Sequence, residues 1–224
     1  YIATYFKYVG YETCLYDRSH LDATCSIDTV DKFIKTHTSV NDVIVNCIGV
    51  IKPRIPVIGV NNTIHINGVF PHILADACKS HDVKMIHPTT DCVYTGHHKA
   101  YDEDSVFDVE VGDVYGLSKA LGDSCSGTVI RSSIIGDEIG QSRSLVEWLK
   151  SERGNTIKGF NNHLWNGVTC LQFAKNIEFL HKNDMLWTGI KHVHSNTVSK
   201  YEIADIVNDV YELDLTIIDY TAPQ

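Results

Sequence analysis

Hydrophobic positions along the chain follow two spacings in turn, one typical of helices and one of buried strands. Around Val30, Phe33 and Ile34, apolar side chains recur three or four positions apart, which is one face of a helix. Residues 42–50 instead form a nearly continuous apolar run, as expected of a parallel strand covered on both faces. Further strands are predicted over 11–17, 83–87 and 128–135, and further helices over 2–10, 66–80 and 113–124. Helices that alternate with buried strands predict an α/β fold.

The second half of the chain carries three signals for the start of a helix. Ser144, Thr169 and Ser199 each precede a Glu or Gln by three residues, an arrangement that closes the first helical turn. A last strand is predicted over 215–220, and loops are predicted over 51–62, which holds two prolines and a glycine, and over 94–114. We therefore expect two interleaved parts, a sheet domain over 1–136 and a smaller lobe over 137–224.

The first residues already show helical spacing, with Ile2, Tyr5, Phe6 and Val9 on one face. A complete dinucleotide-binding domain places a strand and a glycine-rich turn before such a helix. Neither stands in this sequence. We therefore expect a chain without the first strand and the phosphate-binding loop of that domain. Such a fragment would expose strand edges, bind dinucleotide weakly and tend to aggregate.

Composition and charge exclude several classes of protein. A formal net charge of −9 without any run of Lys or Arg argues against nucleic acid as the main partner. No apolar run reaches the roughly 18 residues that span a bilayer, and no secretory signal is present, so we expect no membrane partner. The seven cysteines lack a CxxC pair and lie mostly in apolar stretches, which predicts reduced core thiols in a cytoplasmic protein. Twelve histidines without an HExxH motif or a Cys/His spacing predict no metal site.

Tyr115 and Lys119 carry the clearest chemistry in the sequence. They stand four residues apart in a predicted helix, so they lie on one face about a turn apart. A nearby ammonium favours the phenolate and lowers the pKa of a tyrosine, which could then exchange a proton near neutral pH. Thr89 and Thr90 stand at the end of the strand before that helix, so a hydroxyl is expected beside the phenol.

These motifs resemble those of the extended short-chain dehydrogenase/reductase family, most closely its dTDP-4-dehydrorhamnose reductase-like (RmlD-like) branch of nucleotide-sugar reductases. The resemblance covers nearly the whole chain and implies a Rossmann-type, doubly wound parallel sheet, here without its first strand and glycine-rich loop, with a smaller C-terminal substrate-binding lobe. It implies reduction of the 4-keto group of a nucleotide-linked deoxysugar by NADPH or NADH, in a chain that can form a homodimer. The catalytic residues it implies are Thr90, Tyr115 and Lys119.

The resemblance also implies two sets of binding residues. Asp17 ends a predicted strand and Arg18 follows it. An acid at this place favours NAD and an arginine can meet the 2′-phosphate of NADP, so the form of the cofactor stays open. The full cofactor set is Asp17, Arg18, Cys47, Ile48, Gly49, Asn67, Tyr115, Lys119, Arg131 and Ser133. The substrate set is Asp91, Cys92, Asn161, His163 and Trp165.

Two alternatives stay open at this point. A nucleotide-sugar epimerase or dehydratase of the same fold more often carries a pair of acids where this chain has Asp91 and Cys92. A non-catalytic regulator similar to the β subunit of methionine adenosyltransferase is expected to have lost the hydroxyl, the tyrosine or the lysine. Because Thr90, Tyr115 and Lys119 are all present, a simple reductase is favoured.

Overall fold

A computed structural model describes residues 1–97, 100–138 and 144–223. The chain divides into two compact units. The sheet unit comprises residues 13–132 and 180–192, and the second unit comprises residues 1–12, 133–179 and 193–224. The chain leaves the sheet unit after Ser132, and the helix at residues 2–8 belongs to the second unit.

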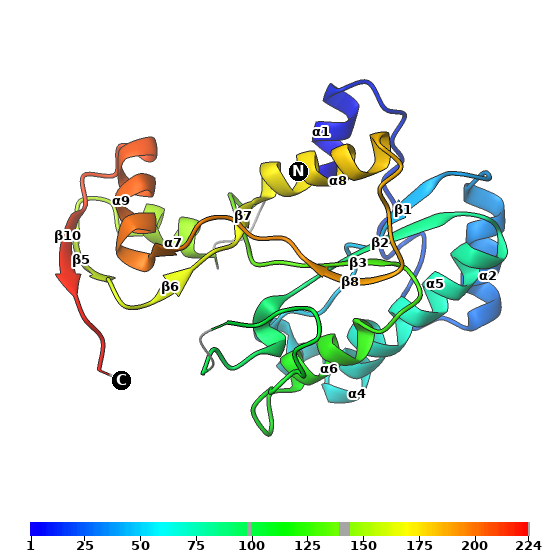
Figure 1. Cartoon of the computed structure of the whole chain (residues 1–224), viewed down its shortest axis with the longest axis horizontal. Helices are drawn as coiled ribbons and strands as arrows, with labels where there is room; N and C mark the ends of the chain where they lie inside the picture. The colour runs from blue at the N-terminus through cyan, green and yellow to red at the C-terminus, as the bar shows by residue number, and fades with distance from the viewer. Residues whose placement is uncertain (98–99, 139–143, 224) are drawn as a thin grey trace. The chain divides into compact units, whose positions relative to one another are not determined.

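The sheet unit is built on four parallel strands in the order β1-β2-β3-β8 (Figure 1). They span Val43–Val45, Lys84–Thr89, Thr128–Arg131 and Gly189–His192. Val45 pairs with Ile86, and Thr89 pairs with Arg131. The α/β fold class with a parallel sheet is therefore confirmed, and the carboxyl ends of these strands meet at one edge.

The predicted strand over 128–135 is two strands in two units. β3 ends at Arg131, and Ser132 still donates its backbone N–H to the carbonyl of Thr89 at 3.3 Å. β4, Ile134–Ile135, pairs instead with β7, Val168–Thr169. Apolar periodicity does not show this change of partner, because both pieces are apolar.

The predicted strand over 11–17 is wrong, because these residues form no strand. They include a run of three apolar side chains, Cys14, Leu15 and Tyr16, yet Leu15 is 69% exposed and Tyr16 is 40% exposed. An extended segment becomes a strand only where a neighbour completes its hydrogen-bond ladder. No strand pairs with residues 11–17 in the part of the chain that the structure describes.

The predicted loop over 51–62 is also wrong, because most of it is helical. It contains the 3-10 turn η1, Lys52–Arg54, and the short helices α3, Ile55–Ile58, and α4, Val60–Ile64. Pro53 and Pro56 each occupy a first-turn position, where the missing N–H costs no helical hydrogen bond. Gly59, with φ of 84°, separates α3 from α4.

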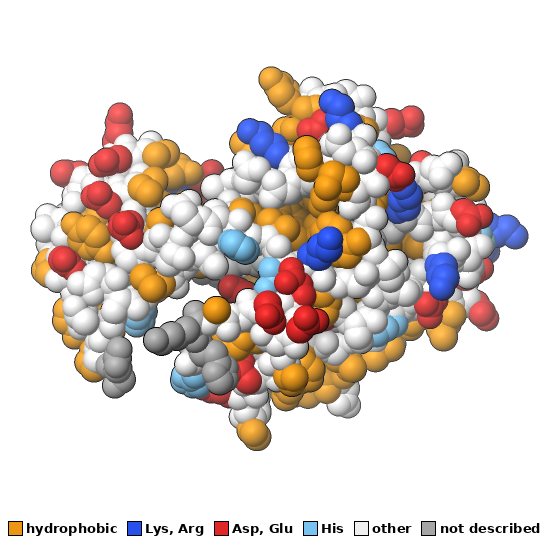
Figure 2. Space-filling view, viewed as in Figure 1, with side chains coloured by type: hydrophobic (Ala, Val, Ile, Leu, Met, Phe, Trp, Pro, Cys, Tyr) orange, Lys and Arg blue, Asp and Glu red, His pale blue; other side chains and the backbone are white. Residues whose placement is uncertain are grey.

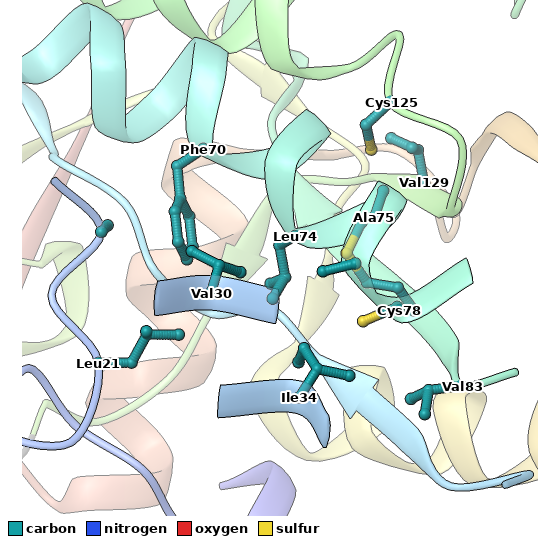
Figure 3. Packing of buried hydrophobic residues seen from close by; sticks show 13 residues of the cluster. Leu21, Val30, Ile34, Phe70, Leu74, Ala75, Cys78, Val83, Cys125 and Val129 are labelled. Atoms are coloured by element: carbon teal, nitrogen blue, oxygen red, sulfur yellow. The ribbon is translucent and has the colours of Figure 1, made fainter. Parts of the chain in front are cut away.

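The core of the sheet unit lies between two helices and the sheet. α2, Ile27–His37, starts at the N-cap Ser26 and buries Val30 and Ile34 against α5, Phe70–Ser80. Figure 3 shows these side chains packed against Phe70 and Leu74. Burial of this kind contributes roughly 1.5–3 kcal/mol for each large apolar side chain.

The helix that carries Tyr115 packs tightly on a neighbouring turn. This helix, α6, spans Val114–Gly122, and it contacts η2, a turn of π-helix over His65–Val69. A Cβ on Gly122 would lie 2.2 Å from the backbone carbonyl oxygen of Asn67, which leaves no room for a side chain.

We expect Gly122→Ala to lower the free energy of unfolding by about 1–3 kcal/mol, since the overlap involves backbone that must shift. Thermal and urea unfolding would measure the loss. Ser124→Ala, an exposed change two residues further along, is the control and should stay within about 0.5 kcal/mol of the parent. Equal midpoints for the two variants would contradict the close approach.

Within its described residues, the second unit contains short strands and four helices. α7, Leu145–Ser151, and α9, Lys200–Tyr211, pack their apolar faces together around Leu149 and Val207. The remaining elements are α1, Ile2–Tyr8; β5, Thr156–Phe160; β6, Leu164–Trp165; α8, Cys170–Lys182; β9, Val198–Ser199; and β10, Thr216–Tyr220. β5 pairs with β10 in parallel, and β6 pairs with β9 antiparallel.

The three predicted helix starts are confirmed. Ser144 accepts the N–H of Glu147, Thr169 accepts the N–H of Gln172, and Ser199 forms a complete capping box with Glu202. Such caps contribute roughly 0.5–2 kcal/mol each.

The prediction of mostly buried thiols is wrong. All seven cysteines are unpaired, but only Cys78 and Cys125 are buried, and Cys14, Cys47 and Cys92 are exposed. Among the described residues, no helix is both long and apolar enough to cross a bilayer.

Candidate active site

The side chain of Asp113 fixes the start of α6 and so the place of Tyr115. Its carboxylate accepts the backbone N–H of Tyr115 at 3.1 Å and that of Gly116 at 3.2 Å. Lys52 reaches the same carboxylate at 2.8 Å, and its ammonium lies 5.8 Å from the centre of the Tyr115 ring. The Asp113 cap therefore holds Tyr115 at the start of the helix, and the Lys52 ammonium pairs with that cap.

The pKa of Tyr115 is raised to about 12, first by burial and then by Cys92, Asp91 and Asp113, while the Thr90 hydroxyl works in the opposite direction. The sequence-based prediction that the pKa of Tyr115 is lowered is therefore wrong for the protein alone. Burial penalises the charged phenolate more than the surrounding groups stabilise it. Tyr115 is a neutral phenol throughout the physiological range, which suits a proton donor.

Thr90 is the hydroxyl beside this phenol, and Thr89 is not. Thr90 accepts the N–H of Cys92 at 3.1 Å and caps η3, Asp91–Val93, while its side chain interacts with the Tyr115 phenol. Thr89 is buried and donates to Asp123 at 2.6 Å. The two adjacent threonines therefore point to different partners, as expected of alternating positions at a strand end.

Lys119 is buried one turn below Tyr115, with only 7% of its surface exposed. Burial lowers the pKa of its ammonium, and Asp123 and Cys47 act in the opposite direction. Its Nζ lies 2.7 Å from the place that a Cβ on Gly49 would take. The absence of a side chain at Gly49 thus leaves the space that the ammonium occupies.

We expect Gly49→Ala to move the Lys119 ammonium while leaving the fold intact, because the overlap is with the end of a flexible side chain. Catalytic turnover should fall about 10-fold or more, since displacements of about an ångström at a reacting centre carry such costs. Steady-state kinetics together with thermal unfolding would separate the two effects. An unchanged kcat in a folded variant would contradict the role of this contact.

Asn67 ties the segment after β1 to α6. Its side chain accepts the N–H of Val50 at 2.7 Å and donates to the Val50 carbonyl at 3.0 Å and to Ser118 at 3.1 Å. The side chain is fully buried. Asn67 therefore orders the site from behind, and a direct contact with the cofactor stays a prediction.

Arg131 belongs to a buried ion pair. Its guanidinium donates to Asp123 at 2.7 Å and 3.1 Å and to the Tyr94 hydroxyl at 2.6 Å. Burial raises the pKa of Asp123, while Thr89 and Arg131 act in the opposite direction. The predicted contact of Arg131 with the cofactor stays a prediction, and the structure shows Arg131 in a buried ion pair with Asp123.

The sequence carries no signal for His87, because a histidine inside an apolar strand belongs to no motif. It is fully buried, with Nδ1 3.2 Å from the amide nitrogen of Asn46. Its Nε2 finds no hydrogen-bond partner among the described residues. Burial and the charge of Lys119 lower the pKa of His87 to about 4, so the ring is neutral.

Four of the predicted cofactor residues line one hollow of about 230 Å³ in the sheet unit, namely Asp17, Arg18, Ile48 and Gly49. Arg54 lines it too, although it lay in a predicted loop. No three His, Cys, Asp or Glu side chains come together as a metal-binding group within residues 1–97, 100–138 and 144–223.

The predicted residues of the second unit make contacts within that unit. Trp165 donates to the hydroxyl of Ser133 at 2.8 Å, and Asn161 donates to Asp219 at 2.7 Å. His163 stacks on Phe160 with ring centres 4.8 Å apart. Their contacts with a substrate, and that of Ser133 with the cofactor, stay predictions.

Basic side chains do not gather on the face of the molecule shown in Figure 2. Lys and Arg stand singly there, between neutral and acidic side chains. With a formal net charge of −9, this face offers no basic band for a nucleic-acid backbone.

The parallel sheet and the tyrosine-bearing helix after β2 define a Rossmann-type α/β protein. The sequence profile described as "RmlD substrate binding domain" matches residues 2–218, and the chain belongs to this family. No curated protein matches the chain by sequence.

Solved structures show the same fold at low identity. A dTDP-4-dehydrorhamnose reductase from Clostridium acetobutylicum aligns with a TM-score of 0.79 and 19% identity, over 99% of this chain and 79% of that chain. The Bacillus anthracis dTDP-4-dehydrorhamnose reductase in complex with NADP aligns with a TM-score of 0.78 and 18% identity, over 99% and 80%. A GDP-D-glycero-L-gluco-heptose synthase from Campylobacter jejuni, solved in the presence of NADPH, aligns with a TM-score of 0.77 and 14% identity, over 99% and 84%.

Proposed function

We propose that this protein reduces the 4-keto group of a nucleotide-linked deoxysugar with NADPH or NADH. The observation that carries the proposal is the pairing of the neutral Tyr115 phenol with the Thr90 hydroxyl, one helical turn from the buried Lys119 ammonium. Thr90 follows the carboxyl end of β2, and Tyr115 and Lys119 lie on α6. Open parallel sheets bind ligands at the carboxyl ends of their strands.

The relatives support the substrate class. Two of the similar structures are dTDP-4-dehydrorhamnose reductases, one of them with NADP, and the Bordetella bronchiseptica enzyme WbmG was solved with NAD and UDP. The predicted substrate residues Asp91 and Cys92 follow Thr90 directly, and both raise the pKa of Tyr115 through their charge.

The residues of the sheet unit fit a nicotinamide cofactor. Gly49 has no side chain, so its backbone lies directly beside the Lys119 ammonium. This ammonium makes no hydrogen bond to any described residue and can therefore donate to ribose hydroxyls. The hollow lined by Asp17 and Arg18 continues from Gly49. When bound, the reduced cofactor supplies the hydride that the carbonyl carbon receives.

The protein's own residues bind the carbonyl and supply the proton. Thr90 and Tyr115 donate hydrogen bonds to the carbonyl oxygen, on which negative charge develops. Tyr115 then transfers its phenolic proton to that oxygen. The Lys119 charge stabilises the phenolate left behind, and Asp113 keeps the tyrosine at the start of α6.

Absorbance of the reduced nicotinamide tests the proposal. NADPH and NADH would be offered to the full-length protein with a panel of nucleotide-linked 4-keto-6-deoxysugars, and consumption of the cofactor is expected with at least one. If the cofactor binds but no sugar is reduced, the regulatory subunit becomes the better account, and a search for a protein partner follows. Release of an isomerised or dehydrated sugar without net oxidation of the cofactor would instead indicate an epimerase or dehydratase.

A further inference from the structure

Asp113 has two opposing effects on Tyr115. Its carboxylate accepts the backbone N–H groups of Tyr115 and Gly116, which fixes the tyrosine at the start of α6. Burial raises the pKa of Tyr115, and the charge of Asp113 adds to that increase, because it disfavours a second negative charge nearby. As a cap, the acid positions the phenol, and as a charge, it opposes loss of the phenolic proton.

Lys52 supplies the opposite charge at this cap. It is the first residue of η1, and its ammonium lies 2.8 Å from Oδ2 of Asp113 and 5.8 Å from the centre of the Tyr115 ring. The hydrogen bond to Asp113 raises the pKa of Lys52, so the side chain keeps its charge into the alkaline range. The Lys52 side chain is 58% exposed, and exposed pairs stabilise a fold little. The main effect of this pair is therefore on the charges around the phenol.

The other charged groups around the phenol are mostly acidic. Besides burial, which has the largest effect, the charges of Cys92 and Asp91 in η3 raise the pKa of Tyr115. Lys119, the cation on α6 itself, is buried one turn further along, and burial lowers the pKa of its ammonium. The ion pair of Lys52 therefore offsets one of several negative charges that oppose the phenolate.

We propose that Lys52 is a charge-compensating residue of the active site, whose ammonium cancels the field of the Asp113 carboxylate at Tyr115. The cap then positions the tyrosine without opposing loss of its proton. This inference rests on the proposed function, in which the phenolic O–H bond breaks, the proton passes to the substrate oxygen and a phenolate is left. Because Lys52 acts through Asp113, it is a positioning residue.

A charge cycle on Lys52 and Asp113 in the full-length protein tests the inference. Lys52→Gln leaves the Asp113 charge uncompensated, so kcat for sugar reduction should fall about 3- to 10-fold, the effect of a unit charge about 6 Å away in a partly solvated site. KM should change little, and Lys52→Arg should retain most of the activity. Asp113→Asn removes the acidic charge and keeps the cap, since asparagine caps helices as well as aspartate does. The double variant, Lys52→Gln with Asp113→Asn, should therefore recover most of the lost kcat.

A tether between η1 and α6 would give a different result in this cycle. The double variant breaks a tether as fully as Lys52→Gln does, so its kcat would be no higher than that of the single variant. That outcome, or an unchanged kcat in a folded Lys52→Gln protein, would overturn the inference. Lys79→Gln is the matched control, because it removes one positive charge from an exposed site on α5 and should leave kcat unchanged.

Titration of the phenol gives a second measurement that needs no turnover. The ¹³Cζ signal of Tyr115 would be followed from about pH 9 to about pH 12. Asp113→Asn should reach the phenolate at a lower pH than the parent, and Lys52→Gln at a higher pH. The same titration in all three proteins would overturn the inference. If the parent binds no nicotinamide cofactor and reduces no sugar, the proposed function fails, while this titration still decides whether Lys52 compensates Asp113.

Discussion

Replacing Tyr115 with phenylalanine is expected to lower kcat for sugar reduction about 100- to 10,000-fold, the range that a positioned proton donor contributes. The ring keeps its packing, so only the hydroxyl beside Thr90 is lost. KM should change little, because the rest of the substrate contacts remain. Steady-state kinetics with thermal unfolding would show a folded but nearly inactive protein.

Tyr8→Phe is the matched control, because that tyrosine is 87% exposed and lies in the second unit. It should retain full activity. A Tyr115→Phe variant that keeps more than about a tenth of the parent kcat would remove the tyrosine from the chemistry, since general acid catalysis accounts for at least 100-fold.

The same phenol gives a pH dependence that can be measured without substrate. With its pKa raised to about 12, Tyr115 stays protonated from neutral pH through the alkaline range in which the protein is handled. Lys119 has its pKa lowered, so as pH rises its ammonium is expected to lose a proton before the phenol does. The ¹³Cζ signal of Tyr115, identified by its absence in Tyr115→Phe, should therefore not move between about pH 6 and pH 9. A phenolate shift in that interval would contradict the burial of this side chain.

Reasoning from the sequence succeeds where a local pattern decides the structure. Tyr115 and Lys119 lie on one helix because their spacing matches a helical turn, and Ser199 starts a helix because its hydroxyl and Glu202 close a capping box. Part of the apolar run over 42–50 becomes a strand, β1 over Val43–Val45, as a continuous apolar run predicts. Each of these outcomes depends on neighbours within a few residues.

Reasoning from the sequence fails where tertiary contacts that no local pattern describes decide the structure. Residues 11–17 have the composition of a strand but no ladder partner among the described residues, and the buried pair of Arg131 with Asp123 has no motif in the sequence. The pKa of Tyr115 depends on its burial and on Asp91 and Asp113, which the spacing to Lys119 does not describe. Arg54 joins Arg18 only because the prolines around it fold the segment into helical turns.

Asp123→Asn is expected to cause the largest loss of stability among the changes considered, about 3–5 kcal/mol, because it leaves the buried Arg131 charge without a counter-ion. For a chain of this size the unfolding midpoint should fall by about 6–20 °C. The change also removes the acceptor of the Thr89 hydroxyl, one residue before Thr90. Activity should therefore fall together with stability, which a change limited to the catalytic groups would not produce.

Asp184→Asn is the matched control, since Asp184 pairs with Lys84 at 2.6 Å but is 85% exposed. An exposed pair contributes about 0–1 kcal/mol, so this variant should unfold within a few degrees of the parent. Replacing both members of the buried pair, in Asp123→Leu with Arg131→Met, should recover much of the loss, because apolar residues of similar volume need no counter-charge. If Asp123→Asn costs no more than Asp184→Asn, the pair does not hold β3 to α6, and Arg131 becomes available for the cofactor contact that the family resemblance implies.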